Sequence, residues 1–227
     1  MMNNHSEVIN KIAYCRIPGE IDPVRWSNLI SSAPGTIQKT IHKYFKTEDQ
    51  YRFLAGRLLL KYLLNTFFSI NDPDILNKIQ FGENGRPFIP CQVDFNISHS
   101  GNLVICAAAT GKIGIDVEWI RPIDIDEFNQ TLSENQRRLI GESPDPLKMF
   151  YRIWAAKESV IKLTGDGIQM PLNEIHSDFT TANFNDKSFF LYEINIDPDY
   201  TCFLASNKKD EDYLIREIEL EVMLSDM

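Results

Sequence analysis

The chain has 227 residues, of which 43% are hydrophobic and 11% aromatic, and its formal net charge at pH 7 is -9. This length allows one large domain or two small ones, and the apolar content is sufficient for a packed core. The negative charge argues against general binding of nucleic acids, because that usually requires a cationic surface that replaces the counterions of the phosphates.

The sequence shows no sign of a membrane or secretory protein. No apolar stretch reaches the ~20 residues that a membrane-spanning helix needs, and the segment MMNNHSEVINK lacks the basic and apolar regions of a signal peptide. The cysteines are scattered without a C-x-x-C pair, and their apolar neighbours predict buried free thiols in a reducing compartment: Cys15, Cys91, Cys106 and Cys202. We therefore expect a cytoplasmic protein with neither a disulfide framework nor a zinc site.

The first third of the chain is predicted to form a strand followed by helices. A turn that contains proline and glycine separates the strand from the first helix. The longest helix is expected to begin at a capping box formed by Thr47 and Gln50 and to continue to about Phe68. The elements expected before it are a strand over residues 8–17, a helix near 24–31 and a helical segment over 36–45.

The rest of the chain alternates between short strands and two capped helices. Ser133 with Gln136 forms a second capping box. Asp145 and Pro146 provide the N-cap and the first position of the next helix, which should end at Gly165. Strands are expected near residues 78–81, 103–109 and 113–119, and the last third is expected to form a meander over 189–194, 201–205 and 215–223.

Two short segments bring charged side chains together. In IGIDVEW, Asp116 and Glu118 share one face of a predicted strand, because alternate residues point to the same side. In WAAKESVIKLTGDG, Glu158 and Lys162 are four residues apart and lie side by side on a predicted helix. If that helix packs across the strand, the carboxylates converge, and they repel each other unless a cation lies among them. Hard oxygen ligands of this kind select Mg²⁺, usually together with substrate phosphates.

A simpler interpretation of these segments is also open. A D-x-E pattern on a half-exposed strand is usually a solvated face, and a Glu/Lys pair at i, i+4 is usually a surface pair that contributes only ~0.2 to 0.5 kcal/mol. The residues upstream favour a ligand site. Pro87 fixes its own φ and keeps Arg86 extended, so that the GRP turn presents a cation. Residues 98–101, SHSG, are predicted to be a loop with hydrogen-bond donors, although an ordinary turn with a structural histidine would look the same.

In this order and spacing, the motifs GRP, FNISHSG, GIDVE and W-x-x-KES-x-x-K-x-x-G-x-G resemble those of the 4'-phosphopantetheinyl transferases, specifically the larger single-chain group of the Sfp type. The match spans about residues 51–167. Enzymes of this family move the phosphopantetheine arm of coenzyme A onto a serine of a carrier protein and release adenosine 3',5'-bisphosphate. The resemblance implies an α+β fold of two similar halves with pseudo-twofold symmetry and an active site at their interface. Residues 1–110 would supply coenzyme A-binding residues, and residues 111–227 the metal site and the catalytic helix.

The resemblance also implies roles for individual residues. Glu158 and Lys162 are the expected catalytic residues: Glu158 as a metal ligand, as the base for the serine hydroxyl, or as both, and Lys162 as a stabiliser of charge on the phosphoryl group or leaving phosphate. His99 is expected to donate to the 3'-phosphate, and Ser98 to a nearby phosphate oxygen. The expected ligands of Mg²⁺, or of Mn²⁺ in its place, are Asp116, Glu118 and Glu158, and those of coenzyme A are Arg52, Gly85, Arg86, Pro87, Ser98, His99 and Lys162.

The expected partners are coenzyme A and an apo acyl or peptidyl carrier protein, with no nucleic acid and no membrane, and the expected state is a monomer. The family often has lysine where this chain has Arg86. The positive charge is kept, but the planar guanidinium group of arginine replaces the compact ammonium group of lysine. Carrier proteins are commonly acidic, and an acidic transferase needs a local docking patch for them. We expect that patch around Arg121 to Phe150, although no motif encodes which carriers are served.

Two other classes of function stay open at the level of the sequence. A different magnesium enzyme that acts on phosphate esters, such as a nuclease or pyrophosphatase, would explain the carboxylates but not the GRP and SHSG motifs. A non-catalytic homologue that binds carriers would be expected to lose a metal ligand or Lys162, and both are present in this chain.

Overall fold

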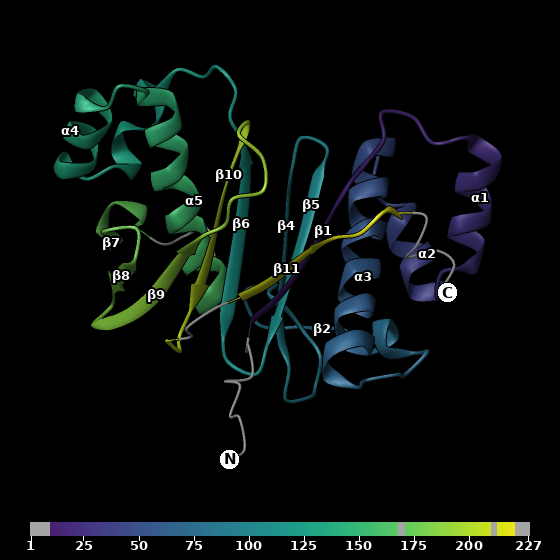
Figure 1. Cartoon of the computed structure of the whole chain (residues 1–227). Helices are drawn as coiled ribbons and strands as arrows, with labels where there is room; N and C mark the ends of the chain where they lie inside the picture. Colours follow the sequence, from purple (N-terminus) through teal and green to yellow (C-terminus); the bar gives the residue numbers. More distant parts are fainter. Residues whose placement is uncertain (1–9, 168–170, 210–212, 221–227) are drawn as a thin grey trace, which may run out of the picture. The chain divides into compact units, whose positions relative to one another are not determined.

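The computed structural model describes residues 10–167, 171–209 and 213–220, and it confirms a mixed α+β chain (Figure 1). The chain divides into two compact units. Unit 1 comprises Met1–Gln80, Pro87–Gly111 and Asp210–Met227, and unit 2 comprises Phe81–Arg86 and Lys112–Lys209. Each unit is therefore built from more than one segment, whereas the halves expected at 1–110 and 111–227 were continuous.

Unit 1 is built on a four-stranded sheet with the order β11-β1-β5-β4. Its strands are β1 (Asn10–Arg16), β4 (Asp94–Ser100), β5 (Leu103–Ala109) and β11 (Tyr213–Glu217). β5 pairs antiparallel with both β1 and β4, and β11 joins the other side of β1 in parallel. All residues of β5 are buried, as expected for a central strand with both faces covered.

The described residues of unit 1 include the helices α1 (Pro23–Ser32), α2 (Gly35–Ile41) and α3 (Thr47–Phe68). α3 packs along β5 and β1, where it can be followed in Figure 1. The helix comes close to the sheet at Gly56, because a Cβ there would lie 2.8 Å from Cγ2 of Ile97. Leu58, Leu59 and Leu60 are all at most 2% exposed, so this part of α3 is buried nearly all round.

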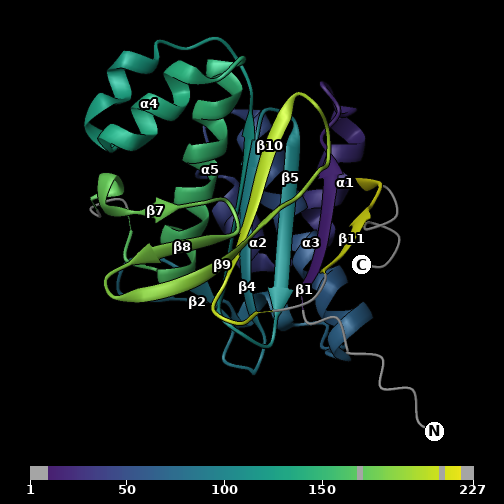
Figure 2. The same ribbon diagram turned by 60° about the vertical axis from the view of Figure 1, so that its left-hand side comes forward.

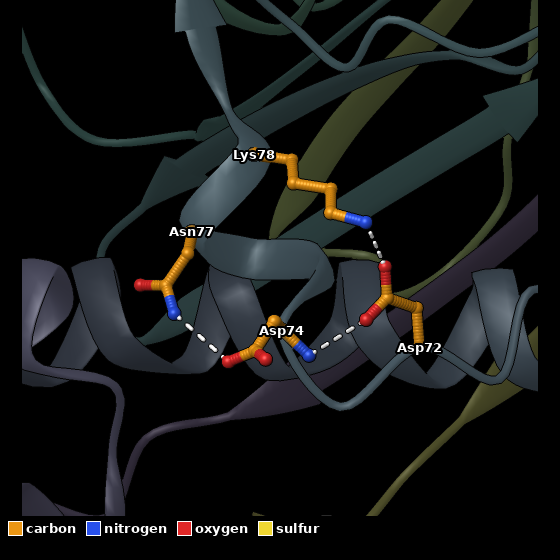
Figure 3. Close-up of polar contacts among 4 residues, drawn as sticks. All are labelled: Asp72, Asp74, Asn77 and Lys78. Carbon is orange, nitrogen blue, oxygen red and sulfur yellow. Dashed lines mark hydrogen bonds and ion pairs between the residues drawn. The ribbon is translucent and has the colours of Figure 1, made fainter.

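A polar turn follows α3 and leads into the short 3-10 helix η1 (Ile75–Lys78) (Figure 3). One carboxylate oxygen of Asp72 accepts from the backbone N–H of Asp74 at 2.9 Å, and the other lies 2.5 Å from Nζ of Lys78. Asn77 donates to the side chain of Asp74 at 3.2 Å. These contacts explain why Lys78 is helical, whereas the strand expected near 78–81 is only β2 (Gln80–Phe81), paired with β3 (Pro87–Phe88).

Unit 2 is built on a five-stranded sheet with the order β6-β10-β9-β8-β7. Its strands β7, β8, β9 and β10 are labelled in Figure 2. Every neighbouring pair in it is antiparallel. β6, which carries the GIDVE motif, is one of the two edge strands, and Glu118 lies directly opposite Thr201 of β10. The strands are β6 (Ile113–Trp119), β7 (His176–Ser177), β8 (Thr181–Phe184), β9 (Lys187–Glu193) and β10 (Tyr200–Ser206).

The longest helix of unit 2 packs across β6 and β10. Its N-cap is Asp145 with Pro146 in the first turn, and its C-cap is Gly165 with φ +75°, so the sequence prediction of both ends is confirmed. The capping box of Ser133 with Gln136 is also present. The helical elements of this unit are η2 (Ile125–Thr131), α4 (Glu134–Glu142), α5 (Pro146–Thr164) and η3 (Leu172–Glu174).

Three predictions from the sequence were wrong in ways that packing explains. The capping box at Thr47 does not form, because the extended N-cap residue is Lys46 and Gln50 donates to the carbonyl of Tyr44 instead. The SHS residues are not a loop, because β4 continues through Ser100. The last strand does not extend a meander, because β11 pairs with β1 of unit 1. Residues 8–9 and 221–223, included in the expected first and last strands, lie outside the described residues.

The cysteines are free, as expected, and Cys15, Cys106 and Cys202 are buried. Cys91 is exposed, and the prediction of a buried thiol there was wrong. It lies at a bend between the exposed residues Pro90 and Gln92, just before β4, and its thiol donates to the carbonyl of Val93 at 3.6 Å. Burial raises the pKa of the Cys15 thiol to about 12, so that thiol stays protonated near neutral pH.

None of the helices within the described residues is both long enough and apolar enough to cross a membrane.

Candidate active site

The motif on β6 and the motif on α5 come together because α5 approaches the sheet at a glycine. A Cβ at Gly114 would lie 2.1 Å from the carbonyl oxygen of Ser159 and 2.4 Å from the backbone nitrogen of Leu163. No side chain fits in that space, so glycine allows the helix to lie directly on the strand. Asp116, on the same face of β6, is consequently covered by α5.

Asp116 is 3% exposed, and its Oδ1 lies 2.5 Å from Nζ of Lys162. The predicted packing of the helix across the strand is confirmed. Because α5 covers the middle of β6, Asp116 is buried, whereas Glu118 nearer the end of the strand is only partly buried. The structure thus brings Asp116 and Lys162 together as an ion pair between strand and helix.

Glu158 lies one helical turn before Lys162 and is partly buried. Its pKa is raised above the ordinary value, first by burial and then by the negative charge of Asp116, while Lys162 acts in the opposite direction. Lys162 links the two carboxylates, because it pairs with Asp116 and lies one helical turn from Glu158. Such a pair of hard oxygen donors with one ammonium group fits a site for Mg²⁺ and phosphate.

Within residues 10–167, 171–209 and 213–220, no group of three or more His, Cys, Asp or Glu side chains is close enough together to hold a metal ion. Lys162 instead provides the positive charge beside Asp116. The ligand set of Asp116, Glu118 and Glu158 therefore stays a prediction.

Arg86 of the GRP turn fastens α5 to β6. Its Nε donates to the carbonyl oxygen of Lys162 at 2.7 Å, and its Nη2 donates to the carbonyl oxygen of Ile113 at 2.8 Å. The turn before it is held by the bond from the N–H of Gly85 to the carbonyl of Gly82, with Gly85 at φ +78°. A guanidinium at the end of α5 also complements the negative end of the helix dipole. Arg86 thus has a structural role beside its expected contact with coenzyme A.

Four of the residues expected to bind coenzyme A belong to unit 1, namely Arg52, Pro87, Ser98 and His99, whereas Gly85, Arg86 and Lys162 belong to unit 2. Arg52 donates from Nε to the carbonyl of Gly101 at 2.9 Å and from Nη1 to Asp49 at 2.7 Å. These bonds place it at the turn that follows β4. Ser98 is 5% exposed and His99 is exposed, because neighbouring residues of β4 point to opposite sides. The structure therefore brings Arg52 close to the end of the SHSG motif.

Two features of unit 2 were not found by sequence reasoning. Lys157, of the KES motif, is 1% exposed, and its Nζ donates to the carbonyl of Thr131 at 2.7 Å. Burial lowers its pKa to about 8. Arg152 makes two bonds, at 2.8 and 2.7 Å, to the carboxylate of Glu193. The partners are 26 and 41 residues apart, so no local pattern could have indicated them.

Comparisons with known proteins agree with the motifs. The model of the 4'-phosphopantetheinyl transferase superfamily matches residues 112–216, and a model described as 4'-phosphopantetheinyl transferase, N-terminal, matches residues 22–111.

Three curated relatives carry the same description. The 4'-phosphopantetheinyl transferase gsp of Aneurinibacillus migulanus is 32% identical over 170 residues, which cover 74% of this chain and 71% of the relative. A 4'-phosphopantetheinyl transferase of Bacillus subtilis is 32% identical over 175 residues, with 75% of each chain covered. The 4'-phosphopantetheinyl transferase Sfp of Bacillus subtilis strain 168 is 34% identical over 144 residues, which cover 60% of this chain and 63% of the relative.

Among solved structures, the holo-acyl-carrier-protein synthase of Thermotoga maritima aligns with a TM-score of 0.33 at 16% identity, over 42% of this chain and 61% of that chain. That score is too low to support a conclusion. The relatives and the two family models are decisive: this chain belongs to the 4'-phosphopantetheinyl transferases.

Proposed function

We propose that this enzyme transfers the 4'-phosphopantetheine group of coenzyme A to a serine hydroxyl of an apo acyl or peptidyl carrier protein, depends on Mg²⁺ and releases adenosine 3',5'-bisphosphate. The observation that carries the proposal is the ion pair between Asp116 and Lys162 where α5 crosses β6, one helical turn from Glu158. These residues lie within the region that matches the transferase superfamily. Their charges suit a phosphorylated substrate with a divalent cation.

The carboxylates have the donor chemistry of a magnesium site. Asp116, Glu118 and Glu158 would hold Mg²⁺, with Mn²⁺ as an alternative, and the bound ion would supply charge neutralisation at the pyrophosphate oxygens of coenzyme A. Asp116 and Glu118 share one face of β6 under the helix that carries Glu158, which supports this assignment.

The protein groups would carry the proton and stabilise the charge. The serine oxygen of the carrier attacks the β-phosphorus, the bond from this phosphorus to the bridging oxygen breaks, and the leaving group is adenosine 3',5'-bisphosphate. The hydroxyl proton passes to Glu158 if that residue acts as the base. The ammonium group of Lys162 stabilises charge on the phosphoryl group or the leaving phosphate. Arg52, Ser98 and His99 would hold phosphate oxygens of coenzyme A.

Other features of the proposal stay predictions. The pseudo-twofold relation of two halves, an active site at their interface and a monomer come from the family resemblance, and the cytoplasm comes from the scattered cysteines. The choice of carriers also stays open, because docking depends on surface complementarity.

The proposal is tested by intact mass spectrometry of an apo carrier protein incubated with the enzyme, coenzyme A and Mg²⁺. A gain of about 340 Da, the mass of one phosphopantetheine group, that is lost with EDTA is the expected result. If coenzyme A does not bind in the presence of Mg²⁺, the transferase proposal is wrong. If it binds but several unrelated carriers stay unmodified, the enzyme has a narrow choice of partner.

A further inference from the structure

Unit 2 contains a pocket whose lining includes none of the residues proposed to bind metal or phosphate or to act in catalysis. It has a volume of about 310 Å³ and lies between Lys148, at the start of α5, and the end of β9, the loop to β10 and the beginning of β10. Small-molecule sites typically begin at about 300 Å³, so a ligand fragment fits in this pocket but a large ligand does not.

The pocket contains a buried hydroxyl group. Thr201 lines it and is only 4% exposed. Its Oγ1 has no hydrogen-bond partner among the described residues. Buried polar side-chain atoms are nearly always hydrogen-bonded, and those that are not require an explanation. A ligand that bonds to this hydroxyl explains why threonine stands here and not valine of the same shape.

The position of Thr201 connects the pocket with the candidate active site. Thr201 lies opposite Glu118, and Phe203 lies opposite Asp116. Opposite residues of an antiparallel pair project from the same face, with their Cβ atoms about 4.5–5.5 Å apart. Lys162 and Arg86 lie toward the other end of this face, where Arg86 bonds to the carbonyl of Ile113. The carboxylates therefore stand between Lys162 on one side and the pocket on the other.

The charges of the lining indicate which part of a substrate fits. Lys148 adds one positive charge, and the carboxylate of Glu193 is neutralised by the two bonds from Arg152, which also stacks over Phe179 at 4.4 Å. Asp197 adds a negative charge, and Asn195 adds an amide. A lining without excess positive charge does not favour a phosphate. It suits a neutral chain with amide groups, to which hydroxyl and amide side chains can bond.

We propose that this pocket binds the pantetheine arm of coenzyme A and that Oγ1 of Thr201 forms a hydrogen bond with an amide group of the arm. The inference rests on the proposed function, because it takes the pyrophosphate to be held at the neighbouring carboxylates. The arm is neutral and rich in amides, and it continues directly from the pyrophosphate. Thr201 is accordingly a residue that recognises the substrate, on a strand to which the family motifs assign no site.

The test compares coenzyme A with adenosine 3',5'-bisphosphate, which lacks the arm, by calorimetric titration of the full-length enzyme with Mg²⁺ present. Thr201→Val keeps the side-chain shape and removes the hydroxyl. We expect it to weaken the binding of coenzyme A by about tenfold and to leave the binding of the bisphosphate unchanged. Asn195→Trp, at an exposed position on the rim, should narrow the pocket and have the same selective effect.

The matched control is Thr181→Val, in β8 of the same sheet but outside the pocket lining. It should leave the binding of both ligands unchanged. Thermal unfolding of the ligand-free protein separates recognition from folding, because the loss of an unpartnered buried hydroxyl should not lower the stability of Thr201→Val.

Several results would overturn the inference. Unchanged binding of coenzyme A in Thr201→Val would mean that the hydroxyl bonds only to water. An equal loss for both ligands would make Thr201 a general support of the site. If Thr201→Val modifies the carrier protein more slowly while its binding of coenzyme A is unchanged, the pocket binds the carrier and not the arm. If the wild-type enzyme binds both ligands equally well, the arm has no pocket although the proposed function stands. If it binds neither, the proposed function fails as well.

Discussion

Lys162 Nζ lies 2.5 Å from Oδ1 of Asp116, although the two residues are 46 positions apart in the chain. Lys162 lies on α5, and Asp116 lies on β6, an edge strand of the sheet in the same unit. The pair joins the motif on β6 to the motif on α5. Together with Glu158 it places two carboxylates and one ammonium group at the site where we propose that phosphopantetheine is transferred. Most of the expected effects of substitution depend on this strand–helix contact.

Glu158→Gln should lower phosphopantetheine transfer by at least about 100-fold, because the amide can neither accept the serine proton nor supply the charge of a metal ligand. The side chain keeps its shape and is only partly buried, so the thermal midpoint should change little. Transfer is measured as the rate of carrier conversion by mass spectrometry, and folding by circular dichroism. The control is Glu142→Gln, an exposed residue at the end of α4. Near-wild-type transfer in Glu158→Gln would remove this residue from the site.

Gly114→Ala should destabilise unit 2 by about 3 kcal/mol or more, because its Cβ would overlap the backbone of α5 at Ser159 and force the helix away from the strand. Urea unfolding measures the difference. Gly141→Ala in α4 is the matched control, because a Cβ there meets nothing within 4 Å. The control should be neutral or more stable by about 0.4–1 kcal/mol, since alanine restricts the unfolded chain. Equal stability of the two variants would contradict the close approach of α5.

Arg86→Ala should lower the rate of transfer by about tenfold or more, because the end of α5 and with it Lys162 would lose two bonds to the guanidinium group. A double-mutant cycle tests whether Arg86 acts through Lys162. In a Lys162→Ala background, Arg86→Ala should lower the rate by clearly less than in the wild-type background, because the part of its effect that passes through Lys162 is already lost. Arg86→Lys should retain only part of the rate, because one ammonium group cannot reproduce both hydrogen bonds of the planar guanidinium group.

The comparison for this cycle is Arg52→Ala, which belongs to unit 1 and bonds to Gly101. Its effect should remain in full in the Lys162→Ala background, because the two residues act on different parts of the substrate. Independent, additive effects of Arg86→Ala and Lys162→Ala would instead indicate that Arg86 contacts a phosphate directly.

The turn before β8 should make stability dependent on pH in acid. The backbone N–H of Thr181, followed by the hydroxyl and N–H of Thr180, lowers the pKa of Asp178 from 3.8 to about 2. A carboxyl group whose pKa is lower in the folded than in the unfolded state stabilises the fold at pH values above its unfolded-state pKa. This contribution is lost as the pH falls toward the folded-state pKa of about 2. Asp178→Ala should therefore unfold at a lower temperature than wild type at pH 7. The difference between the two should shrink between pH 4 and pH 2 and should not grow there.

Local patterns predicted elements whose ends are set by a few neighbouring residues. Three helix ends were predicted correctly, because each depends on side chains or backbone within one turn. They are the N-cap of α5 at Asp145, its C-cap at Gly165 and the capping box at Ser133. The capping box at Thr47 failed, because Gln50 found a competing partner in the carbonyl of Tyr44. The sheet to which the last strand belongs could not be predicted from local patterns either, because β11 pairs with β1, at the opposite end of the sequence.

The sequence by itself determined the family, through the order and spacing of its motifs. It also predicted that Asp116, Glu118, Glu158 and Lys162 form one site, because strand and helix periods place these residues on common faces. Only the tertiary structure decided that Asp116 is buried under α5, that Arg86 holds the end of that helix and that Thr201 brings an unpartnered hydroxyl to the side of Glu118. These relationships join residues that are distant in the chain. They arise from the packing of a helix on a sheet, which depends on the shape and volume of many side chains at once and leaves no local pattern.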